Sequence, residues 1–412
     1  MPSKSPDHVE VATLDEILLR IARTYSSITD EPELVALRSS LGRVLADDVT
    51  SATRIPSFDN SAVDGWAVRT ADLGEAPRAL PIGGRIVAGH PLDKDLRPGF
   101  AYRIFTGAAI PTGLDAVAMQ ENCTATADTV EIPNLKPGEN VRYAGETIEI
   151  GQTALKAGCR LRSQEIGLAA MLGLAELPVR RRLRVAMFST GDELREVGHP
   201  LDLGCIYDSN RHTLFGLLDG LGCEVTDLGI IADTPSAARD AMVRAATAQD
   251  LVISTGGASV GEEDHIKTIL AELGEITQWK LAIKPGKPVV LGRIGTTPFI
   301  GLPGNPVSVM VTFLLVARPI IARLSGLGLP PPRRYRLPAN FSLEKKVGRR
   351  EFHRAVLFAD EGKFAVDLFH NDSSAVLTSM TVADGLIDLP EQALAIAPGD
   401  LVSFLPLREL QP

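Results

Sequence analysis

The sequence predicts an α/β multidomain protein with a central parallel-sheet α/β domain at residues 183–328. From Leu183 onward, apolar runs of strand length alternate with helical patterns, which is typical of βαβ units and a mainly parallel sheet. Residues 53–147 consist instead of short β-like runs interrupted by Gly and Pro, which indicates an inserted β-rich module. The chain has 412 residues, enough for two to four domains at about 100–200 residues each.

The first part of the chain predicts a domain that the insertion divides. Residues 14–25 carry apolar side chains at helical spacing, and a second helical pattern follows Ser163, a typical N-cap residue. We therefore expect residues 1–52 and 148–182 to form a split N-terminal helical segment on either side of the β-rich module.

The central domain alternates strand and helix repeatedly. The runs LRVAMFST, CEVTDLGII, DLVIST and TPFIGLPG have strand length, and helical patterns follow them. The helical pattern from Pro306 to about Ala322 is apolar and shorter than a membrane span, so we interpret it as a buried helix. Three consecutive prolines then mark a linker, and the β-rich runs of residues 329–412 predict a C-terminal β-barrel-like domain.

The composition excludes several classes of protein. The formal net charge of −9 argues against a nucleic-acid partner, because nucleic-acid binding needs a basic surface. The first residues have no apolar core of a signal peptide, and no apolar run reaches the length of a bilayer span. The four cysteines form no C-x-x-C pattern. We expect a reduced cytoplasmic protein with no membrane contact.

Three loops follow predicted strands of the central domain: STGDEL (189–194), STGGASVGEED (254–264) and LPGNP (302–306). Ligands bind outside the carboxyl ends of parallel strands, and Gly-rich loops before helices suit phosphate. The alternative is three tight turns without a ligand. The candidate substrate-binding residues of these loops are Thr190, Gly191, Thr255, Gly256, Gly257, Ser259, Gly261, Pro303, Gly304 and Asn305.

A local basic patch follows in WKLAIKPGKP (279–288), where Lys280, Lys284 and Lys287 are closely spaced around a Pro-Gly turn. Lysine binds phosphate as a compact point charge. These side chains supply the positive charge that an anionic ligand would need in an acidic chain. The alternative is a solvated hairpin.

Carboxylates accompany the same loops: Glu193, Asp233, and the run Glu262, Glu263 and Asp264. Mg²⁺ is held by one or two carboxylates together with substrate phosphates, so acids beside a phosphate loop favour a magnesium site. We expect Glu193 and Asp264 as metal ligands. The alternative for Asp264 is capping of the helix that starts after it.

The segment PSFDNSAVDGWAVR (56–69) combines turn-forming residues around Asp64 with the aromatic anchors Phe58 and Trp66. A segment of this type is more often structural than functional. Asp64 also precedes the Gly-rich loop by about 190 residues, so it could reach that loop only through folding or from another subunit.

Together these segments resemble the molybdopterin molybdenumtransferases, the family of the MoeA proteins and the gephyrin E domain. The matching segments, in chain order, are FDNSAVDGWAVR, RIFTGAAIPTGLDAVAMQE, STGDEL, DSN, DLVISTGGASVGEEDH, WKLAIKPGKPVVLG, GLPGNPVSV and GRREFHRA. They extend over roughly residues 10–390.

The resemblance implies an enzyme of molybdenum cofactor biosynthesis. Such enzymes insert molybdate into adenylylated molybdopterin with Mg²⁺ or a similar cation and release AMP. It also implies an elongated homodimer whose site lies between the α/β domain of one subunit and the inserted module of the other. The family's important acids correspond to Asp64, Glu193, Asp233 and Asp264, and its ligand-binding residues to Thr106, Ser209, Asn210, Lys280 and Lys284.

The chain departs from the family pattern at Thr147 in AGETIEIG, where the family usually has an Asp. Threonine cannot carry the charge, so this protein would be slower or would use Glu146. Three alternatives stay open: a related pterin-adenylylating enzyme, a catalytically weakened scaffold or binding protein, and tungstate as the oxyanion. Transient contacts with other cofactor-biosynthesis proteins or apo-molybdoenzymes are also expected.

Overall fold

The central domain is built on a six-stranded sheet with the order β16–β13–β17–β21–β20–β18 in the computed structural model, which describes residues 11–29, 31–92, 94–256, 265–360 and 362–411. The first four strands are parallel, as predicted, whereas β20 runs antiparallel to both of its neighbours, β21 and β18. The strands are β13 (Arg184–Thr190), β16 (Glu224–Ile231), β17 (Leu251–Thr255), β18 (Gly274–Lys280), β20 (Pro288–Ile294) and β21 (Thr297–Leu302).

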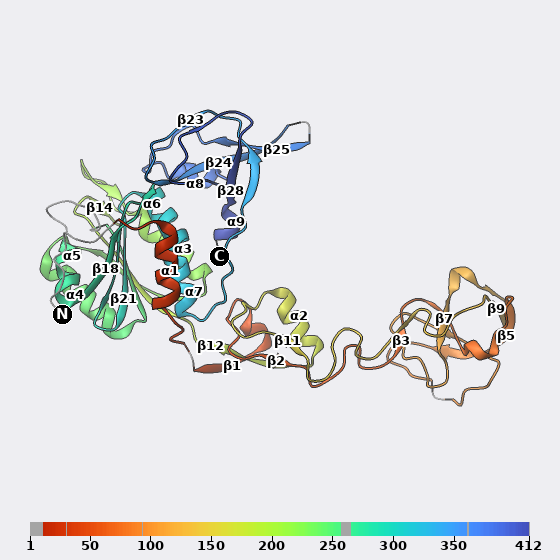
Figure 1. Ribbon diagram of the computed structural model, residues 1–412. Helices are drawn as coiled ribbons and strands as arrows, with labels where there is room; N and C mark the ends of the chain where they lie inside the picture. The colour runs from red at the N-terminus through yellow and green to blue at the C-terminus, as the bar shows by residue number, and fades with distance from the viewer. Residues whose placement is uncertain (1–10, 30, 93, 257–264, 361, 412) are drawn as a thin grey trace.

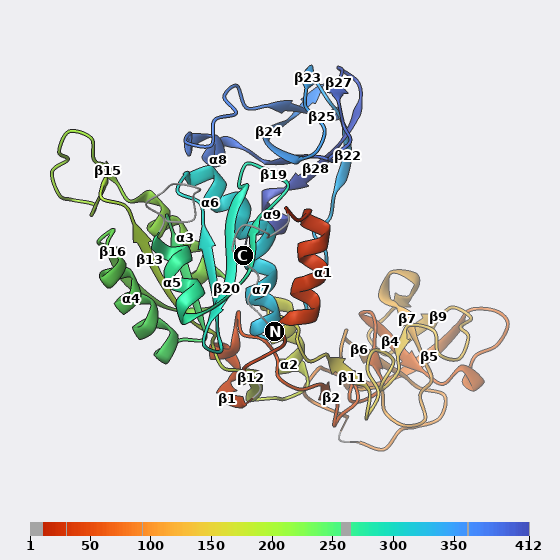
Figure 2. The same ribbon diagram turned by 60° about the vertical axis from the view of Figure 1, so that its left-hand side comes forward.

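Helices cover both faces of this sheet (Figures 1 and 2). On one face, α4 (Pro235–Ala248) and α5 (His265–Leu273) enclose an apolar core around Phe188 and Phe299. The other face packs against α3 (Ser209–Gly220) and a continuous helix from Pro306 to Leu324. Helix α1 (Leu14–Thr24) lies against the end of that long helix, so the N-terminal helix contributes to the same core.

The long helix consists of α6 (Pro306–Thr312), a π-helical turn (Phe313–Ala317) and α7 (Arg318–Leu324). Among the described residues it is the one helix long and apolar enough to cross a membrane. However, 89% of its apolar window is buried inside the protein. The interpretation as a buried core helix is therefore confirmed.

The split segment is mixed rather than purely helical. Its two parts pair as antiparallel strands, β1 (Pro32–Ala36) with β12 (Glu176–Arg180) and β2 (Val49–Thr50) with β11 (Thr153–Leu155). Helix α2 (Ser163–Met171) and a short 3₁₀ turn pack beside them. Periodicity revealed the helix, whereas strands of two to five residues leave too little pattern to recognise.

The inserted module stands at the far end of an elongated molecule, away from the α/β domain (Figures 1 and 2). The segments that enter and leave the module run side by side, and the Ile55 N–H donates to the Ile148 carbonyl at 2.9 Å. The module's sheet has the order β7–β4–β6–β5–β9–β8. Its strands are β4 (Gly65–Val68), β5 (Arg78–Ile86), β6 (Ala101–Ile104), β7 (Ala116–Met119), β8 (Thr124–Ala125) and β9 (Thr129–Ile132), and β3 (Asn60–Ser61) pairs separately with β10 (Val141–Arg142).

The C-terminal domain closes into a barrel, as predicted. Its strands follow the order β22–β28–β26–β24–β25, and a bridge between Ala339 and Val366 joins the end of β22 to β25. The bounds are β22 (Tyr335–Pro338), β24 (Arg350–Asp360), β25 (Lys363–Leu368), β26 (Gly385–Leu389) and β28 (Leu401–Pro406). One further strand, β19 (Ile283–Lys284), comes from the α/β domain and pairs with β24, which fixes the two domains together.

Candidate functional site

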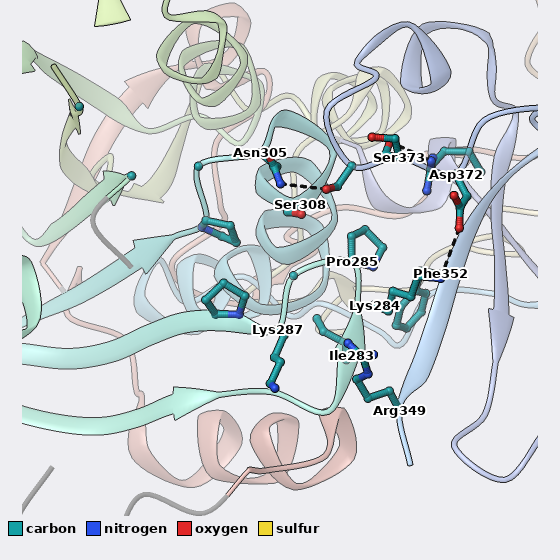
Figure 3. Close-up of a pocket in the computed structure, with 18 of the residues that line it drawn as sticks. Ile283, Lys284, Pro285, Lys287, Asn305, Ser308, Arg349, Phe352, Asp372 and Ser373 are labelled. Atoms are coloured by element: carbon teal, nitrogen blue, oxygen red, sulfur yellow. Dashed lines mark hydrogen bonds and ion pairs between the residues drawn. The ribbon is translucent and has the colours of Figure 1, made fainter. Parts of the chain in front are cut away.

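A pocket of about 730 Å³ lies where the carboxyl ends of the parallel strands face the C-terminal barrel (Figure 3). The loops after β13, β17 and β21 form one side. The turn that follows β19 and residues from β24 and from 372–374 form the other. The ten sequence-predicted residues that line it are Thr190, Gly191, Glu193, Asp233, Gly256, Lys284, Lys287, Pro303, Gly304 and Asn305.

Asn210 and Thr255 hold the strand-end loops in register with one another. The Asn210 amide donates to Thr255 Oγ1 at 3.1 Å and to the Gly304 carbonyl at 2.6 Å. The Thr255 hydroxyl donates in turn to the Pro303 carbonyl at 3.0 Å. Neither side chain lines the pocket itself, so both residues position its loops without facing a ligand in the pocket. Ser209, the first residue of α3, lies beside them and outside the pocket lining.

Two glycines are required by the close approach of these loops. Gly256 has φ +82°, and a Cβ there would lie 2.3 Å from the Thr190 carbonyl oxygen. Gly191 has φ +147°, and a Cβ there would lie 2.5 Å from Glu193 Oε2. A side chain at either position would therefore displace the loop or the Glu193 carboxylate.

Strand β19 and the turn after it place Lys284 and Lys287 at the pocket. Gly286 has φ +101° and packs against Thr312 of α6, where a Cβ would lie 2.3 Å from Cγ2. Lys284 pairs with Asp372 at 3.3 Å and with Glu351 at 3.5 Å, both on the barrel side. The hydrogen bond from Lys284 lowers the pKa of Asp372, which keeps that carboxylate ionised. Lys284 is thus partly neutralised.

The barrel side of the pocket was not predicted. Arg354 donates to Ser379 Oγ at 3.1 Å and to the Asn371 and Ser373 carbonyls at 3.0 and 3.2 Å. All three acceptors are neutral, and the nearby Asp372 carboxylate interacts with the Arg354 charge without forming an ion pair with it. The Asn305 amide reaches across to Ser374 Oγ at 3.0 Å. The signal for this wall was the segment GRREFHRA, which belongs to the family resemblance but carried no roles for its residues.

His353 adds no positive charge to that wall. Its Nε2 lies 2.9 Å from Glu351 Oε2, and the ring is almost fully buried. Burial lowers the pKa of His353 despite that carboxylate, so the ring is neutral at physiological pH. The other polar lining residues that were missed are Arg349, Asp372, Ser373 and Ser374 on this side and Ser308 of α6 on the other.

Charge is therefore divided across the pocket. Glu193 and Asp233 stand at the strand ends. The turn after β19 and the segment around β24 contribute Lys287, Arg349 and Arg354, which make no ion pair with any described residue; Lys287 and Arg349 are labelled in Figure 3. Arg354 is also buried, and although the Asp372 carboxylate on the same side interacts with its charge, no carboxylate is bonded to it, which favours an anionic ligand. The arrangement suits a ligand whose anion contacts the barrel side and whose other end meets the two acids.

Asp64 and Thr106 lie together, but far from this pocket. The Thr106 N–H and hydroxyl both donate to Asp64 Oδ1 at 2.8 Å. Gly65 permits the strand pairing that positions them, because a Cβ there would lie 1.9 Å from the Ala118 carbonyl oxygen. Both residues belong to the inserted module, at the other end of the molecule from the α/β domain (Figure 1).

Other predicted site residues do not line this pocket or lie outside the described residues. Lys280 ends β18 and does not line the pocket. The described residues bring no three His, Cys, Asp or Glu side chains together in a way that could hold a metal ion. Of the predicted metal ligands, only Glu193 lies within those residues. The predicted site residues outside them are Gly257, Ser259, Gly261 and Asp264.

Three family models match the chain in consecutive segments. They are described as MoeA N-terminal region (domain I and II), residues 12–173; probable molybdopterin binding domain, residues 186–323; and MoeA C-terminal region (domain IV), residues 336–407. A molybdopterin molybdenumtransferase of Haemophilus influenzae is 40% identical over 389 residues, which cover 92% of this chain and 95% of the relative. The chain belongs to the MoeA family.

Solved MoeA structures agree with this membership along the whole chain. A molybdopterin biosynthesis MoeA protein from Pyrococcus horikoshii OT3 aligns with a TM-score of 0.83 at 26% identity. The alignment covers 96% of this chain and all of that one. The MoeA resemblance found in the sequence and the predicted fold class are thus both confirmed.

Proposed function

We propose that this chain is a molybdopterin molybdenumtransferase, which inserts molybdate into adenylylated molybdopterin and releases AMP. The carrying observation is that Lys287, Arg349 and Arg354, which make no ion pair with any described residue, line the same pocket as Glu193 and Asp233. Molybdate is a small dianion, and the adenylylated pterin carries a phosphoanhydride. The three cations provide a binding surface for the oxyanion, and the strand-end loops provide backbone N–H groups for phosphate.

The carboxylates of the site would bind the cation and transfer protons. In our proposal Glu193 and Asp264 hold Mg²⁺, and a hard cation shared with phosphate oxygens is chemistry that carboxylate donors fit. When bound, the cation would polarise the phosphoanhydride and stabilise the departing AMP. Asp233 lines the same end of the pocket and is placed to accept or return protons as molybdate exchanges oxygen for the dithiolene sulfurs.

A homodimer completes the site in this proposal. Asp64 and Thr106 belong to the inserted module. The paired segments β1–β12, β2–β11 and Ile55–Ile148, which we call the stalk, hold this module away from the α/β domain of its own chain (Figure 2). A partner's module can reach the pocket if the two chains cross. We also propose a cytoplasmic location, with transient contacts to other cofactor-biosynthesis proteins or apo-molybdoenzymes.

AMP release tests the activity directly. Purified protein with adenylylated molybdopterin, molybdate and Mg²⁺ should release AMP and yield cofactor that activates an apo-molybdoenzyme. Lys287→Ala should abolish release at low molybdate, whereas Lys363→Ala, an exposed lysine on β25, should not. No release above a heat-inactivated control would refute the proposal. ATP consumption without any need for molybdate would favour the pterin-adenylylating alternative.

Subunit complementation tests the shared site. At low molybdate, Asp64→Asn and Lys287→Ala each inactivate the enzyme in our proposal, one on the module and one in the pocket. Co-expressed as a mixture, they form heterodimers in which one of the two sites is intact. Activity should return to about one quarter of wild type, since random pairing makes half of the dimers mixed. A mixture as inactive as its components would show that each chain completes its own site.

A further inference from the structure

A row of arginines and aromatic rings crosses the inserted module next to Asp64. Arg103 of β6 pairs in register with Trp66 of β4 on one side and with Arg85 of β5 on the other. The Arg103 guanidinium lies 5.5 Å from the Trp66 ring centroid and 5.0 Å from that of Phe105. Arg85 lies 4.6 Å from the same Phe105 ring. We call Trp66, Arg103, Phe105 and Arg85 the arginine ladder.

The two arginines of the ladder differ in how their charge is compensated. Arg103 donates to the Gly65 carbonyl at 3.2 Å and to the Gln120 side chain. Its charge also helps to lower the pKa of Asp64, after the larger effect of the hydrogen bonds from Thr106. Arg85 is exposed and makes no hydrogen bond or ion pair with any described residue.

The Arg85 guanidinium lies beside a second cation and is less well compensated than Arg103, whose charge interacts with the Asp64 and Glu121 carboxylates. Like charges at neighbouring register positions repel, and no described carboxylate pairs with Arg85 to offset the repulsion. Contact with the Phe105 ring returns only a modest cation–π attraction at an exposed site. Contact with the Phe105 ring also restricts the Arg85 guanidinium. Because Arg85 is exposed, its N–H donors and the face turned away from the ring are accessible to a ligand. A guanidinium binds phosphate with paired N–H donors and stacks on flat rings.

We infer that the arginine ladder binds the ring-bearing, phosphorylated end of the substrate, with Arg85 as the residue that recognises it. The chemical class is a phosphate ester of a flat heteroaromatic ring. Phe105 precedes Thr106 directly, so a ligand that meets Asp64 and Thr106 also lies beside the ladder. The inference deepens the proposed function and rests on it for the identity of the substrate.

Direct binding tests the ladder without the full reaction. The probe is 6-hydroxymethyl-7,8-dihydropterin pyrophosphate, titrated into the full-length protein at low salt and followed by ligand fluorescence. Arg85→Gln should weaken binding about tenfold, and Arg85→Lys should weaken it less, because the charge stays and the planar fork is lost. The matched control is Arg97→Gln, since Arg97 also lies over a ring of the module, 4.1 Å from Phe100. An unchanged dissociation constant for Arg85→Gln, or an equal loss for Arg97→Gln, would overturn the inference.

Two further arms distinguish recognition of the ligand from a structural role of the ladder. Inorganic pyrophosphate and 6-hydroxymethylpterin should each bind more weakly than the probe, and pyrophosphate binding with the same affinity would reject recognition of the ring. The thermal midpoint of Arg85→Gln should stay equal or rise, because a repulsion is removed; a lower midpoint would assign Arg85 a structural role. A lower dimer fraction with unchanged probe binding would make the ladder a subunit contact instead.

Kinetics keep this inference distinct from the proposed function. In the AMP-release reaction, Arg85→Gln should raise KM for the adenylylated pterin and leave kcat close to wild type. If wild type releases AMP and Arg85→Gln matches it in both KM and probe affinity, the function stands and the ladder inference fails. If wild type releases no AMP, the proposed function fails, and the probe titration still decides whether the ladder binds this class of ligand.

Discussion

Thr106 donates two hydrogen bonds, from its backbone N–H and its hydroxyl, to the same oxygen of Asp64. These bonds favour the ionised carboxylate and lower the pKa of Asp64, the backbone bond contributing most. Asp64 therefore enters any reaction as an anion at neutral pH and in mild acid. The hydrogen bonds from Thr106 extend this ionised state to lower pH.

Thr106→Val removes one of the two donors and preserves the shape of the side chain. The pKa of Asp64 should rise, because the charged form loses a hydrogen bond. Activity that needs the anion is lost as pH falls through this pKa, so the acid limb of the AMP-release profile should move to higher pH. Thr126→Val, in an exposed turn of the same module, is the control and should leave the limb in place. An unmoved limb in Thr106→Val would contradict the assignment.

Gly256 and Gly304 both line the pocket, but only one should be indispensable. Gly256→Ala puts a Cβ 2.3 Å from the Thr190 carbonyl in a left-handed backbone conformation, whereas nothing lies within 4 Å of a Cβ at Gly304. Gly256→Ala should lose at least about 1–2 kcal/mol of stability from its backbone conformation alone, and most of its activity. Gly304→Ala should fold normally. Urea denaturation and AMP release measure both, and equal behaviour of the two variants would refute the steric argument.

Asp250 anchors the start of β17 to two arginines. Burial alone would raise its pKa, but hydrogen bonds from Arg181 and Arg184 outweigh burial and lower the pKa to about 2. Stability from such a lowered pKa is present above the unfolded value and lost as pH falls through the folded one. Asp250→Asn should therefore cost about 2 kcal/mol at pH 7 and progressively less between pH 4 and pH 2.

Urea denaturation at several pH values measures this difference. Asp240→Asn, an exposed carboxylate on α4, serves as the control and should change stability little at any pH. A loss in Asp250→Asn that does not shrink in acid would mean that geometry, rather than charge, is what Asp250 contributes.

Thr147 should limit turnover. Its N–H is bonded to the Ile55 carbonyl at 3.0 Å, while its side chain is exposed at the base of the module. The Glu146 carboxylate is engaged locally, since it accepts from the Tyr143 N–H at 3.0 Å. Thr147→Asp should raise the rate of AMP release several-fold, and Thr124→Asp, on the exposed strand β8, should not. An equal rate in Thr147→Asp would show that the missing acid is dispensable here.

Local pattern was enough to predict one wall of the pocket. Thr190 ends one strand, and Gly256 and Gly304 follow two others; the apolar run of each strand is visible in the sequence, and parallel strands bring their carboxyl ends to one edge. The assignment of Lys284 and Lys287 as a basic patch needed only their spacing.

The opposite wall depends on contacts that no local pattern encodes. Arg349 and Arg354 enter the pocket because β19 leaves the α/β domain and pairs with β24 of the barrel, about 65 residues later in the chain. The distance between Asp64 and the pocket could not be predicted either, because the strands of the stalk are too short to be recognised in the sequence. The predicted domain boundaries stay predictions.

The stalk also bears on the order in which the protein can fold. Strands β1 and β12 pair across an intervening segment of about 140 residues, and closing so long a loop is entropically costly. The Ile55–Ile148 bridge joins the two ends of the module at a point between the module and the β1–β12 pairing. A module that folds first reduces the open loop to the residues of the stalk itself. If the module folds first, the Ile55–Ile148 bridge shortens the loop that the β1–β12 pairing must close, and a short turn in place of the module would serve the same topological purpose.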